Sequence, residues 1–362
     1  MSVYIHIPFC SHICSYCDFP KVLKNNIWIK KYLKALEKEI KLNYKGEEIN
    51  TLYIGGGTPS SLELSDLKVL FNIFKIFNFS KDVEITFEAN SEDLTEEKLL
   101  FLSRKINRLS IGVETFNNNR LKDLNRELCV DNIKKASKYF KNINLDLMYG
   151  FDRQTIDDLK NDLDEILKLN PSHISTYSLI IEKNTKFYID GYRSIDEGLD
   201  RKMYDLIIDT LKKNNYIHYE VSNFSKKGFE SRHNLVYWNN DNYYGFGLGA
   251  SGYINKCRYE NTRSLNDYFK GNYLLESHDL DISEEIQNEL ILGFRKIEGI
   301  NKNKFKDRYG FNLKDIDCVD DLLEKKLLLE DDNNMFINPK YMYISNEILI
   351  NFIDYVYTNN GL

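Results

Sequence analysis

The sequence predicts an α/β fold, namely a partial, TIM-like (β/α)6 barrel followed by a smaller, mostly helical C-terminal domain. Strand-like apolar runs alternate with amphipathic helical stretches over residues 1–225, and such alternation gives parallel strands joined by right-handed crossovers. The chain has 362 residues, which is too long for one ordinary compact core. From about residue 282 the pattern changes to short helices. These observations predict the two-part architecture.

Six short apolar runs are the expected parallel strands, and they cover residues 3–9, 51–57, 83–90, 108–114, 143–150 and 173–180. Residues 28–44 and 64–78 repeat apolar positions at helical spacing between the first three strands. A further strand-like run, residues 216–224, leads into an expected loop over residues 231–253, rich in glycine and aromatic side chains. The six strand–helix units predict a barrel that is open or only partly closed.

The predicted boundaries divide the chain into a barrel (1–225), a connecting region (226–281) and a C-terminal domain (282–362). Three runs in the last part read as short helices, and residues 335–345 read as a terminal hairpin; the helical runs are 283–294, 301–310 and 315–329. Helices followed by a hairpin resemble a winged helix. The second and third helices carry mixed or acidic charge, so we expect this domain to pack and to cover substrate, not to bind DNA.

Composition limits the classes of function. The formal net charge is −6, which gives no electrostatic support for nucleic-acid binding. No run approaches the roughly 20 apolar residues that a membrane-spanning helix needs. The expected first strand begins at Val3, which leaves no room for a signal peptide. Cys129, Cys257 and Cys318 are isolated, a pattern that suits a reducing compartment, so we expect a cytoplasmic protein.

Three cysteines stand within eight residues, directly after the first expected strand. Cys10, Cys14 and Cys17 form a C-x3-C-x2-C loop, and soft thiolates select zinc or iron–sulfur clusters. Zinc in a structural site usually takes four protein ligands, and His12 is the candidate for the fourth. Three cysteines on a [4Fe–4S] cluster leave one iron open to the amino and carboxylate groups of S-adenosylmethionine. Unliganded thiols are the third alternative.

Further polar and glycine residues end the other expected strands, where parallel αβ barrels place their chemistry. The run GGGTP, residues 55–59, follows the second strand. Gly56 and Gly57 let backbone groups approach a ligand closely, and Thr58 adds a polar contact. A plain glycine-rich turn is the alternative. The combination of a cysteine loop after one strand and a glycine-rich turn after the next strand is uncommon, and it favours the iron–sulfur interpretation.

With these motifs the chain resembles the radical S-adenosylmethionine superfamily, and within it the branch that holds oxygen-independent coproporphyrinogen III oxidases and haem chaperones. The resemblance runs from Tyr4 to about Gly252 and continues more weakly through residues 289–300. It implies a radical S-adenosylmethionine barrel in which Cys10, Cys14 and Cys17 hold a [4Fe–4S] cluster.

The resemblance also implies the residues of the nucleotide site. Tyr4 matches a tyrosine beside the cluster and the sulfonium, Glu88 an acidic cofactor contact, and Asp146 a ribose partner. The remaining residues that we expect to line this site are Gly56, Gly57, Thr58, Glu114 and Arg126. Glu114 stands where these families carry glutamine, so an acceptor is kept and an amide donor is lost.

Three features distinguish oxidase from chaperone in this resemblance. Phe19 stands where the oxidase has a fourth cysteine, and no arm precedes the barrel strand. Residues 233–238, HNLVYW, match a motif tied to haem handling in the chaperones. A neutral imidazole is a common ligand of haem iron, and flat aromatic rings pack on a macrocycle. The expected haem-binding residues are His233, Asn234, Tyr237 and Trp238, whereas His6, His173 and His218 lie in strand patterns and are expected to be structural.

The favoured interpretation is a cytoplasmic protein that binds haem and transfers it to an acceptor protein, with a flavodoxin- or ferredoxin-type protein as electron donor. The first alternative is an enzyme, the oxygen-independent coproporphyrinogen III oxidase, which decarboxylates propionate side chains by radical chemistry. The second is a zinc-stabilised binding module without redox chemistry. The sequence leaves the haem acceptor and the oligomeric state open.

Overall fold

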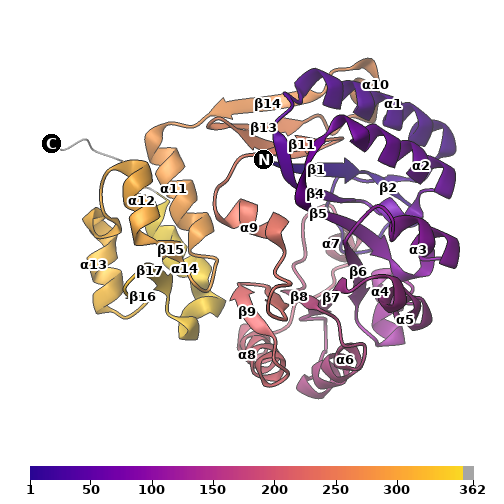
Figure 1. The fold of residues 1–362 in the computed structure, drawn as a ribbon. Helices are drawn as coiled ribbons and strands as arrows, with labels where there is room; N and C mark the ends of the chain where they lie inside the picture. The colour runs from indigo at the N-terminus through magenta and orange to yellow at the C-terminus, as the bar shows by residue number, and fades with distance from the viewer. Residues whose placement is uncertain (354–362) are drawn as a thin grey trace.

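A computed structural model describes residues 1–353 of the protein, so the last nine residues of the expected C-terminal domain, 354–362, lie outside it. Its main sheet has 12 strands in the order β14-β13-β12-β11-β1-β4-β5-β6-β7-β8-β10-β9. This sheet curves through the larger part of the molecule, and the C-terminal helices stand to one side (Figure 1). Within the described part, no helix is both long enough and apolar enough to cross a lipid bilayer.

The six expected parallel strands are confirmed, and they are neighbours in chain order. Each contains buried aliphatic or aromatic side chains, which fit a sheet covered on its outer face. The strands are β1 (Ser2–Ile7), β4 (Glu48–Gly56), β5 (Asn78–Asn90), β6 (Arg108–Glu114), β7 (Asn142–Tyr149) and β8 (His173–Ser178). Their carboxyl ends therefore meet at one rim of the partial barrel.

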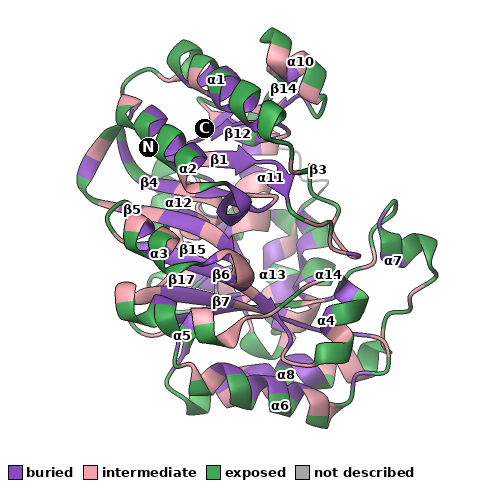
Figure 2. Ribbon diagram, turned by 90° about the vertical axis from the view of Figure 1, so that its right-hand side faces the viewer, coloured by how far each residue is buried: buried purple, intermediate pink, exposed green. Residues whose placement is uncertain are grey.

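Helices cover the outside of these strands, with exposed faces outward and buried faces against the sheet (Figure 2). Local signals fix several helix starts: Asn25 caps α1 through its side chain, and Thr155 and Asp158 form a capping box on α6. The helices are α1 (Asn26–Asn43), α2 (Leu64–Ile73), α3 (Glu96–Leu102), α4 (Asn118–Leu124), α5 (Val130–Tyr139), α6 (Ile156–Lys168), α7 (Lys186–Ile189) and α8 (Glu197–Lys213).

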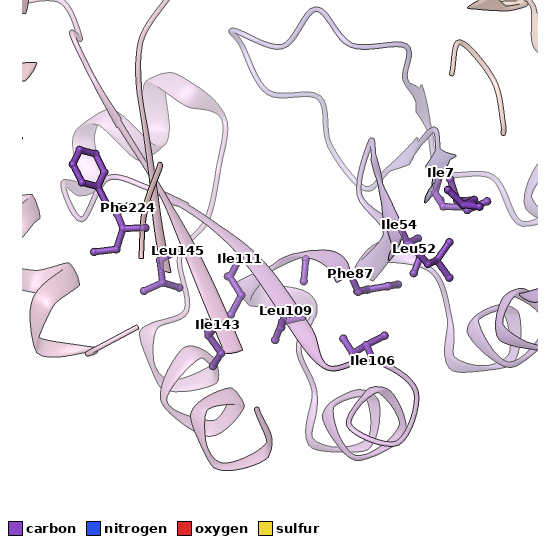
Figure 3. Close-up of a cluster of buried hydrophobic side chains, with 14 of the residues drawn as sticks. Ile7, Leu52, Ile54, Phe87, Ile106, Leu109, Ile111, Ile143, Leu145 and Phe224 are labelled. Atoms are coloured by element: carbon purple, nitrogen blue, oxygen red, sulfur yellow. The ribbon is translucent and has the colours of Figure 1, made fainter. Parts of the chain in front are cut away.

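The hydrophobic core lies between the parallel strands and these helices. Figure 3 shows aliphatic and aromatic side chains from successive strands in one continuous layer, including Leu52, Phe87, Leu109 and Leu145. All four are buried, with at most 1% of their surface exposed. Burial of a side chain of this size contributes about 1.5–3 kcal/mol, so this layer stabilises the frame that holds the rim.

The region after β8 differs from the prediction in two places. Residues 216–224 form a hairpin of β9 (Ile217–Glu220) and β10 (Asn223–Ser225) instead of one strand. The expected loop 231–253 contains α9 (Arg232–Trp238), β11 (Tyr243–Phe246), which pairs parallel to β1, and the start of β12. The antiparallel edge is completed by β12 (Ser251–Ile254), β13 (Cys257–Asn261), α10 (Leu265–Lys270) and β14 (Leu274–Asp279). The connecting region therefore continues the barrel sheet, and the boundaries at residues 225 and 281 stay predictions.

The C-terminal part has three main helices and its own small sheet, ordered β15-β17-β16. The expected hairpin at residues 335–345 is wrong, because the hairpin joins β16 to β17 and a 3-10 helix begins at Pro339, which has no N–H for a strand ladder. The elements are α11 (Ile282–Gly293), β15 (Ile300–Asn301), α12 (Lys302–Tyr309), α13 (Asp317–Glu324), β16 (Leu328–Glu330), β17 (Asn334–Ile337) and α14 (Ser345–Leu349). Residues 295–297 bond to β9 and its turn, which attaches this part to the barrel.

Candidate functional site

A pocket of about 520 Å³ opens at the carboxyl rim of the parallel strands. It brings together most of the side chains that the sequence predicts for the cluster and the nucleotide. Those residues are Cys10, Cys14, Cys17, Gly56, Gly57, Thr58, Glu88, Glu114, Arg126 and Asp146. Asn234 joins them from α9, whereas Tyr4, His233, Tyr237 and Trp238 do not line this pocket.

Short backbone pairings hold the cysteine loop over the pocket. Cys10 ends β2 (Phe9–Cys10), which pairs parallel to β3 (Val22–Leu23), and its carbonyl accepts a hydrogen bond from the Lys24 N–H. Burial raises the pKa of the Cys10 thiol to about 11 and also raises the pKa of Cys14. The Arg126 guanidinium, with Nη1 3.7 Å from Cys14 Sγ, favours the thiolate. A positively charged metal centre would complete that stabilisation.

The positions of the three thiols fit a cluster better than a single ion. Among residues 1–353, no three His, Cys, Asp or Glu side chains converge as the ligands of one metal ion do. A cubane offers a different iron to each thiolate, so its ligands need not converge. His12, the fourth ligand of the zinc alternative, does not line the pocket, and its Nε2 lies 4.0 Å from Glu92 Oε1. The zinc alternative therefore gains no support.

The glycine turn after β4 fits closely under the cysteine loop. A Cβ atom on Gly57 would lie 2.9 Å from Cys10 Sγ and 2.8 Å from the Pro8 carbonyl carbon. Gly56 has a φ of +117°, and a Cβ there would meet the His6 ring at 2.7 Å. Both positions therefore require glycine, and the turn brings bare backbone to the pocket beside the thiols.

Glu88 holds this turn in place. Its carboxylate accepts hydrogen bonds from the Tyr53 hydroxyl, at 2.7 Å, and from the Gly56 N–H, at 3.0 Å. Burial raises the pKa of Glu88 to about 7, against the lowering effect of the Tyr53 hydrogen bond. Tyr53 lies on the expected second strand but was not among the predicted site residues. The alternation of side chains along a strand could have identified it, because Tyr53 stands two residues before Gly55 on the same face of β4.

Glu114 and Arg126 form a buried ion pair beside the cysteine loop, with Arg126 Nη1 3.5 Å from Glu114 Oε1. Glu114 has a φ of 64°, an uncommon conformation for a residue with a side chain. Its Oε1 accepts a hydrogen bond from Tyr16, whereas its buried Oε2 has no partner within the described residues. Burial raises the pKa of Glu114 to about 7. The Glu114 Oε2 atom is therefore available to accept a hydrogen bond from a ligand. Glutamine, which the related families carry here, would offer an amide donor that Glu114 lacks.

Asp146 lies deeper in the pocket, on the middle of β7. Its Oδ1 accepts a hydrogen bond of 2.6 Å from Asn144 Nδ2, and burial raises the pKa of its carboxyl group. Asn144 also donates to Ser110 and accepts from His173, so a polar network continues below Asp146. This position is compatible with the ribose contact that the resemblance implies.

Tyr4 faces a second, smaller pocket together with Phe19 and Tyr237. Its hydroxyl lies 3.0 Å from His6 Nδ1, and His6 Nε2 lies 2.7 Å from the Pro20 carbonyl oxygen. Tyr4 is therefore connected to the end of the cysteine loop through His6. The His6 side chain bonds both to Tyr4 on the first strand and to Pro20, which follows Cys17. Contact between Tyr4 and the cluster stays a prediction.

The helix α9 carries the HNLVYW motif, and His233 is fully buried in it. Its Nδ1 lies 2.7 Å from Thr51 Oγ1, and its Nε2 lies 2.9 Å from the Tyr237 hydroxyl. Glu84 accepts hydrogen bonds from the backbone N–H groups of Arg232 and His233. Burial lowers the pKa of His233 to about 3, so the imidazole is neutral. In this conformation neither ring nitrogen is free to bind iron.

The other motif residues point in different directions. Asn234 lines the main pocket, and Tyr237 lines the smaller one. The Trp238 ring lies 5.8 Å from the guanidinium carbon of Arg295, at the attachment of the C-terminal part. The four residues do not present one common face, and haem contact by them stays a prediction. His173 and His218 are buried within the sheet, where His173 is hydrogen-bonded and His218 stacks on Phe224.

Comparisons with known proteins found a family model and curated relatives that match the chain. The family model described as Radical SAM superfamily matches residues 4–166. The protein named Heme chaperone HemW from Lactococcus lactis is 38% identical, over 97% of this chain and 97% of its own length. HemW from Bacillus subtilis is 36% identical over 97% and 99%, and HemW from Escherichia coli is 32% identical over 84% and 85%.

The same architecture occurs in a solved structure. Coproporphyrinogen III oxidase (HemN) from Escherichia coli, described as a radical SAM enzyme, superposes with a TM-score of 0.86. The match covers 98% of this chain and 90% of the oxidase, at 22% sequence identity. At this identity the likeness concerns the fold, which includes both the barrel and the C-terminal part.

Proposed function

The chain belongs to the HemW family within the radical SAM superfamily, and from this premise we propose that it is a haem chaperone. In this proposal it binds haem and passes it to an acceptor protein in the cytoplasm. A flavodoxin- or ferredoxin-type protein supplies electrons to its cluster. The relatives' names support haem handling, and the pocket supports the two cofactors of the superfamily.

The pocket residues fit the [4Fe–4S] cluster and S-adenosylmethionine. Cys10, Cys14 and Cys17 supply three thiolates, and the Gly56–Gly57 backbone leaves room beside them. Arg126 stabilises the Cys14 thiolate and pairs with Glu114, whose free Oε2 is an acceptor for a ligand hydroxyl or ammonium group. When bound, the cluster supplies one electron and an open iron for the nucleotide.

The observation that carries the haem proposal is the position of α9. This helix lies between the barrel and the C-terminal helices (Figure 1). Asn234 reaches the cluster pocket, and Trp238 reaches Arg295. A ligand bound by this helix would therefore lie close to both the barrel and the C-terminal part. Because the imidazole is neutral, it is in the form that binds iron.

Haem ligation by His233 requires a change at α9. Either Thr51 must leave Nδ1, or the Tyr237 hydroxyl must leave Nε2. The Tyr237 hydrogen bond lies within one turn of the same helix and depends on one side-chain rotamer. We therefore propose that rotation of Tyr237 exposes Nε2 to haem iron, while Thr51 holds the other nitrogen and sets the tautomer.

Haemin titration of the anaerobically reconstituted protein tests this function. We expect about four irons per chain and a Soret band that saturates with haemin. His233→Ala should weaken that band, whereas His278→Ala should leave it unchanged, because His278 is an exposed side chain paired with Glu284. An unchanged Soret band in His233→Ala would exclude the ligand, and protein that takes up one zinc and no iron would exclude the cluster.

The oxidase alternative is tested with the same preparation. The fold shared with HemN is the reason to test this particular enzymatic activity. The reconstituted protein is incubated with coproporphyrinogen III, S-adenosylmethionine and a reductant. Sustained conversion to protoporphyrinogen IX would overturn the chaperone proposal. We expect no sustained conversion, in agreement with Phe19 at the position where the oxidase resemblance calls for a cysteine.

A further inference from the structure

Arg108 is a buried cation without a partner. It begins β6, only 2% of its surface is exposed, and it lines the cluster pocket. Within residues 1–353, no hydrogen bond or ion pair involves its guanidinium group, and its Nε is buried without a partner. Buried arginines are ordinarily paired, since an unpaired buried charge is strongly unfavourable. An anion in the pocket would supply the missing partner.

The nearest acidic side chains do not supply that anion. Glu88 gives one oxygen to Tyr53 and the other to the Gly56 N–H. Asp146 accepts from Asn144, on the neighbouring strand β7. Both carboxylates lie beyond ion-pair distance of Arg108, so they interact with it only by longer-range electrostatics. The guanidinium group is thus left facing the pocket.

Two neutral donors share the pocket with Arg108. The Ser110 hydroxyl accepts a hydrogen bond from Asn144 Nδ2, at 2.8 Å, and its own hydrogen remains available. The half-buried amide of Asn234 makes no side-chain hydrogen bond within the described part of the chain. A guanidinium group with two further donors is the arrangement that recognises a carboxylate.

This place is distinct from the thiolate end of the pocket. Arg108 and Glu114 stand at opposite ends of β6, six residues apart, which corresponds to about 20 Å of extended backbone. Arg126, the other pocket arginine, already contacts Asn90, the Gly112 carbonyl and Cys14. A ligand anchored by Arg108 would therefore reach past the cysteine loop into the barrel.

We infer that Arg108, Ser110 and Asn234 form a carboxylate-binding subsite in the interior of the cluster pocket. The carboxylate is a propionate of haem, because the aminoacyl carboxylate of S-adenosylmethionine belongs to the open iron of the cluster at the thiolate end. This inference rests on the proposed function. The subsite also gives Asn234 of the HNLVYW helix a binding role that is separate from His233.

The test compares haemin with haemin dimethyl ester, which lacks the free carboxylates. The reconstituted full chain is titrated with both, in the same detergent, by absorbance. S-Adenosylmethionine, titrated by equilibrium dialysis, is the control ligand, because its carboxylate belongs at the cluster. Arg108→Met removes the charge, and Arg108→Lys keeps it. Arg120→Met is the matched control, because Arg120 pairs with Asp158 outside the pocket lining.

We expect Arg108→Met to weaken haemin binding by about 10- to 100-fold, while haemin dimethyl ester and S-adenosylmethionine keep their affinities. Arg108→Lys should restore part of the loss. Asn234→Asp serves as a second variant if Arg108→Met does not fold, since it preserves shape at a half-buried site and adds a repelling charge. It should weaken the same ligand by about 10-fold or more and spare the analogue.

The outcomes separate the subsite from the proposed function. A loss of haemin affinity that haemin dimethyl ester does not share supports the subsite. Equal losses for haemin and its ester, or no loss for either, would overturn the subsite while the haem function stands. If haemin fails to bind the unsubstituted protein, the haem function falls, and the propionate subsite falls with it.

Discussion

His233 and Thr51 are 182 residues apart in the chain, and a hydrogen bond of 2.7 Å joins the imidazole Nδ1 to the threonine hydroxyl. Thr51 lies on β4, the strand that ends in the glycine turn beside the thiols. The motif helix is therefore fixed to the same strand that shapes the cluster pocket. A movement of α9 would therefore disturb the strand that leads to the cofactor site.

Replacement of Tyr237 by phenylalanine should strengthen haem binding. The change removes the hydroxyl that occupies His233 Nε2 and keeps the ring packed against Tyr243. Loss of one such hydrogen bond corresponds to a gain of about 2- to 10-fold in affinity, measured by haemin titration of the Soret band. The double variant with His233→Ala should show no gain. Unchanged affinity in Tyr237→Phe would show that iron does not use Nε2.

Alanine in place of Cys14 should abolish the cluster, because two thiolates would remain for a site that needs three. Iron content and the visible absorbance of the anaerobically reconstituted protein measure the loss. Cys257→Ala is the matched control, since Cys257 lies on β13, away from the pocket. We expect the control to retain its iron. Full iron content in Cys14→Ala would contradict the ligand assignment.

Alanine at Gly57 should loosen the cysteine loop, because its Cβ would lie 2.9 Å from Cys10 Sγ and 2.8 Å from Pro8 backbone. We expect a loss of about 1–3 kcal/mol in the free energy of unfolding and reduced iron retention. Chemical denaturation and iron analysis measure the two effects. Gly198→Ala, whose closest contact is the movable Asp196 side chain, should cost neither stability nor iron. Normal iron retention in Gly57→Ala would show that the turn adapts.

Glutamine at position 114 should change how stability depends on pH. Burial raises the pKa of Glu114 to about 7, above its value in the unfolded chain, so ionisation destabilises the fold as pH rises through that range. Between pH 5 and 8 the wild-type protein should lose up to about 3 kcal/mol that Glu114→Gln does not lose. Denaturation of metal-free protein at several pH values measures this difference. Glu37→Gln, at an exposed pair with Lys41, should follow the wild-type curve, and identical curves for all three proteins would contradict the prediction.

Local patterns were sufficient to predict the barrel and the residues of its rim. Cys10, Gly57 and Glu88 each follow or end a run whose periodicity predicts a strand, and parallel strands bring such ends together. Strand β11 was missed because its four residues lie between asparagine- and glycine-rich segments. The start of α9 had a signal, since Ser231 caps the helix by accepting from the Asn234 N–H.

The burial of His233 had no local signal. Its ring nitrogens are occupied by Thr51, far away in the chain, and by Tyr237, one helical turn later. The motif alone identifies a histidine with two aromatic neighbours and does not show which way each side chain points. The unpaired state of Arg108 had no signal either, because the two acidic side chains that could pair with it, Glu88 on β5 and Asp146 on β7, are bonded to other groups. Long-range contacts therefore determine which members of a motif reach the ligand.

The seven-residue helix α9 is tethered at both ends. Glu84 receives two backbone N–H groups at its start, and the Lys296 ammonium group donates to Asn239 just after its end. A movement of the whole helix therefore has to break contacts at both ends, whereas rotation of the Tyr237 side chain breaks neither set. Uptake and release of a ligand through that rotation alone would leave the helix in place.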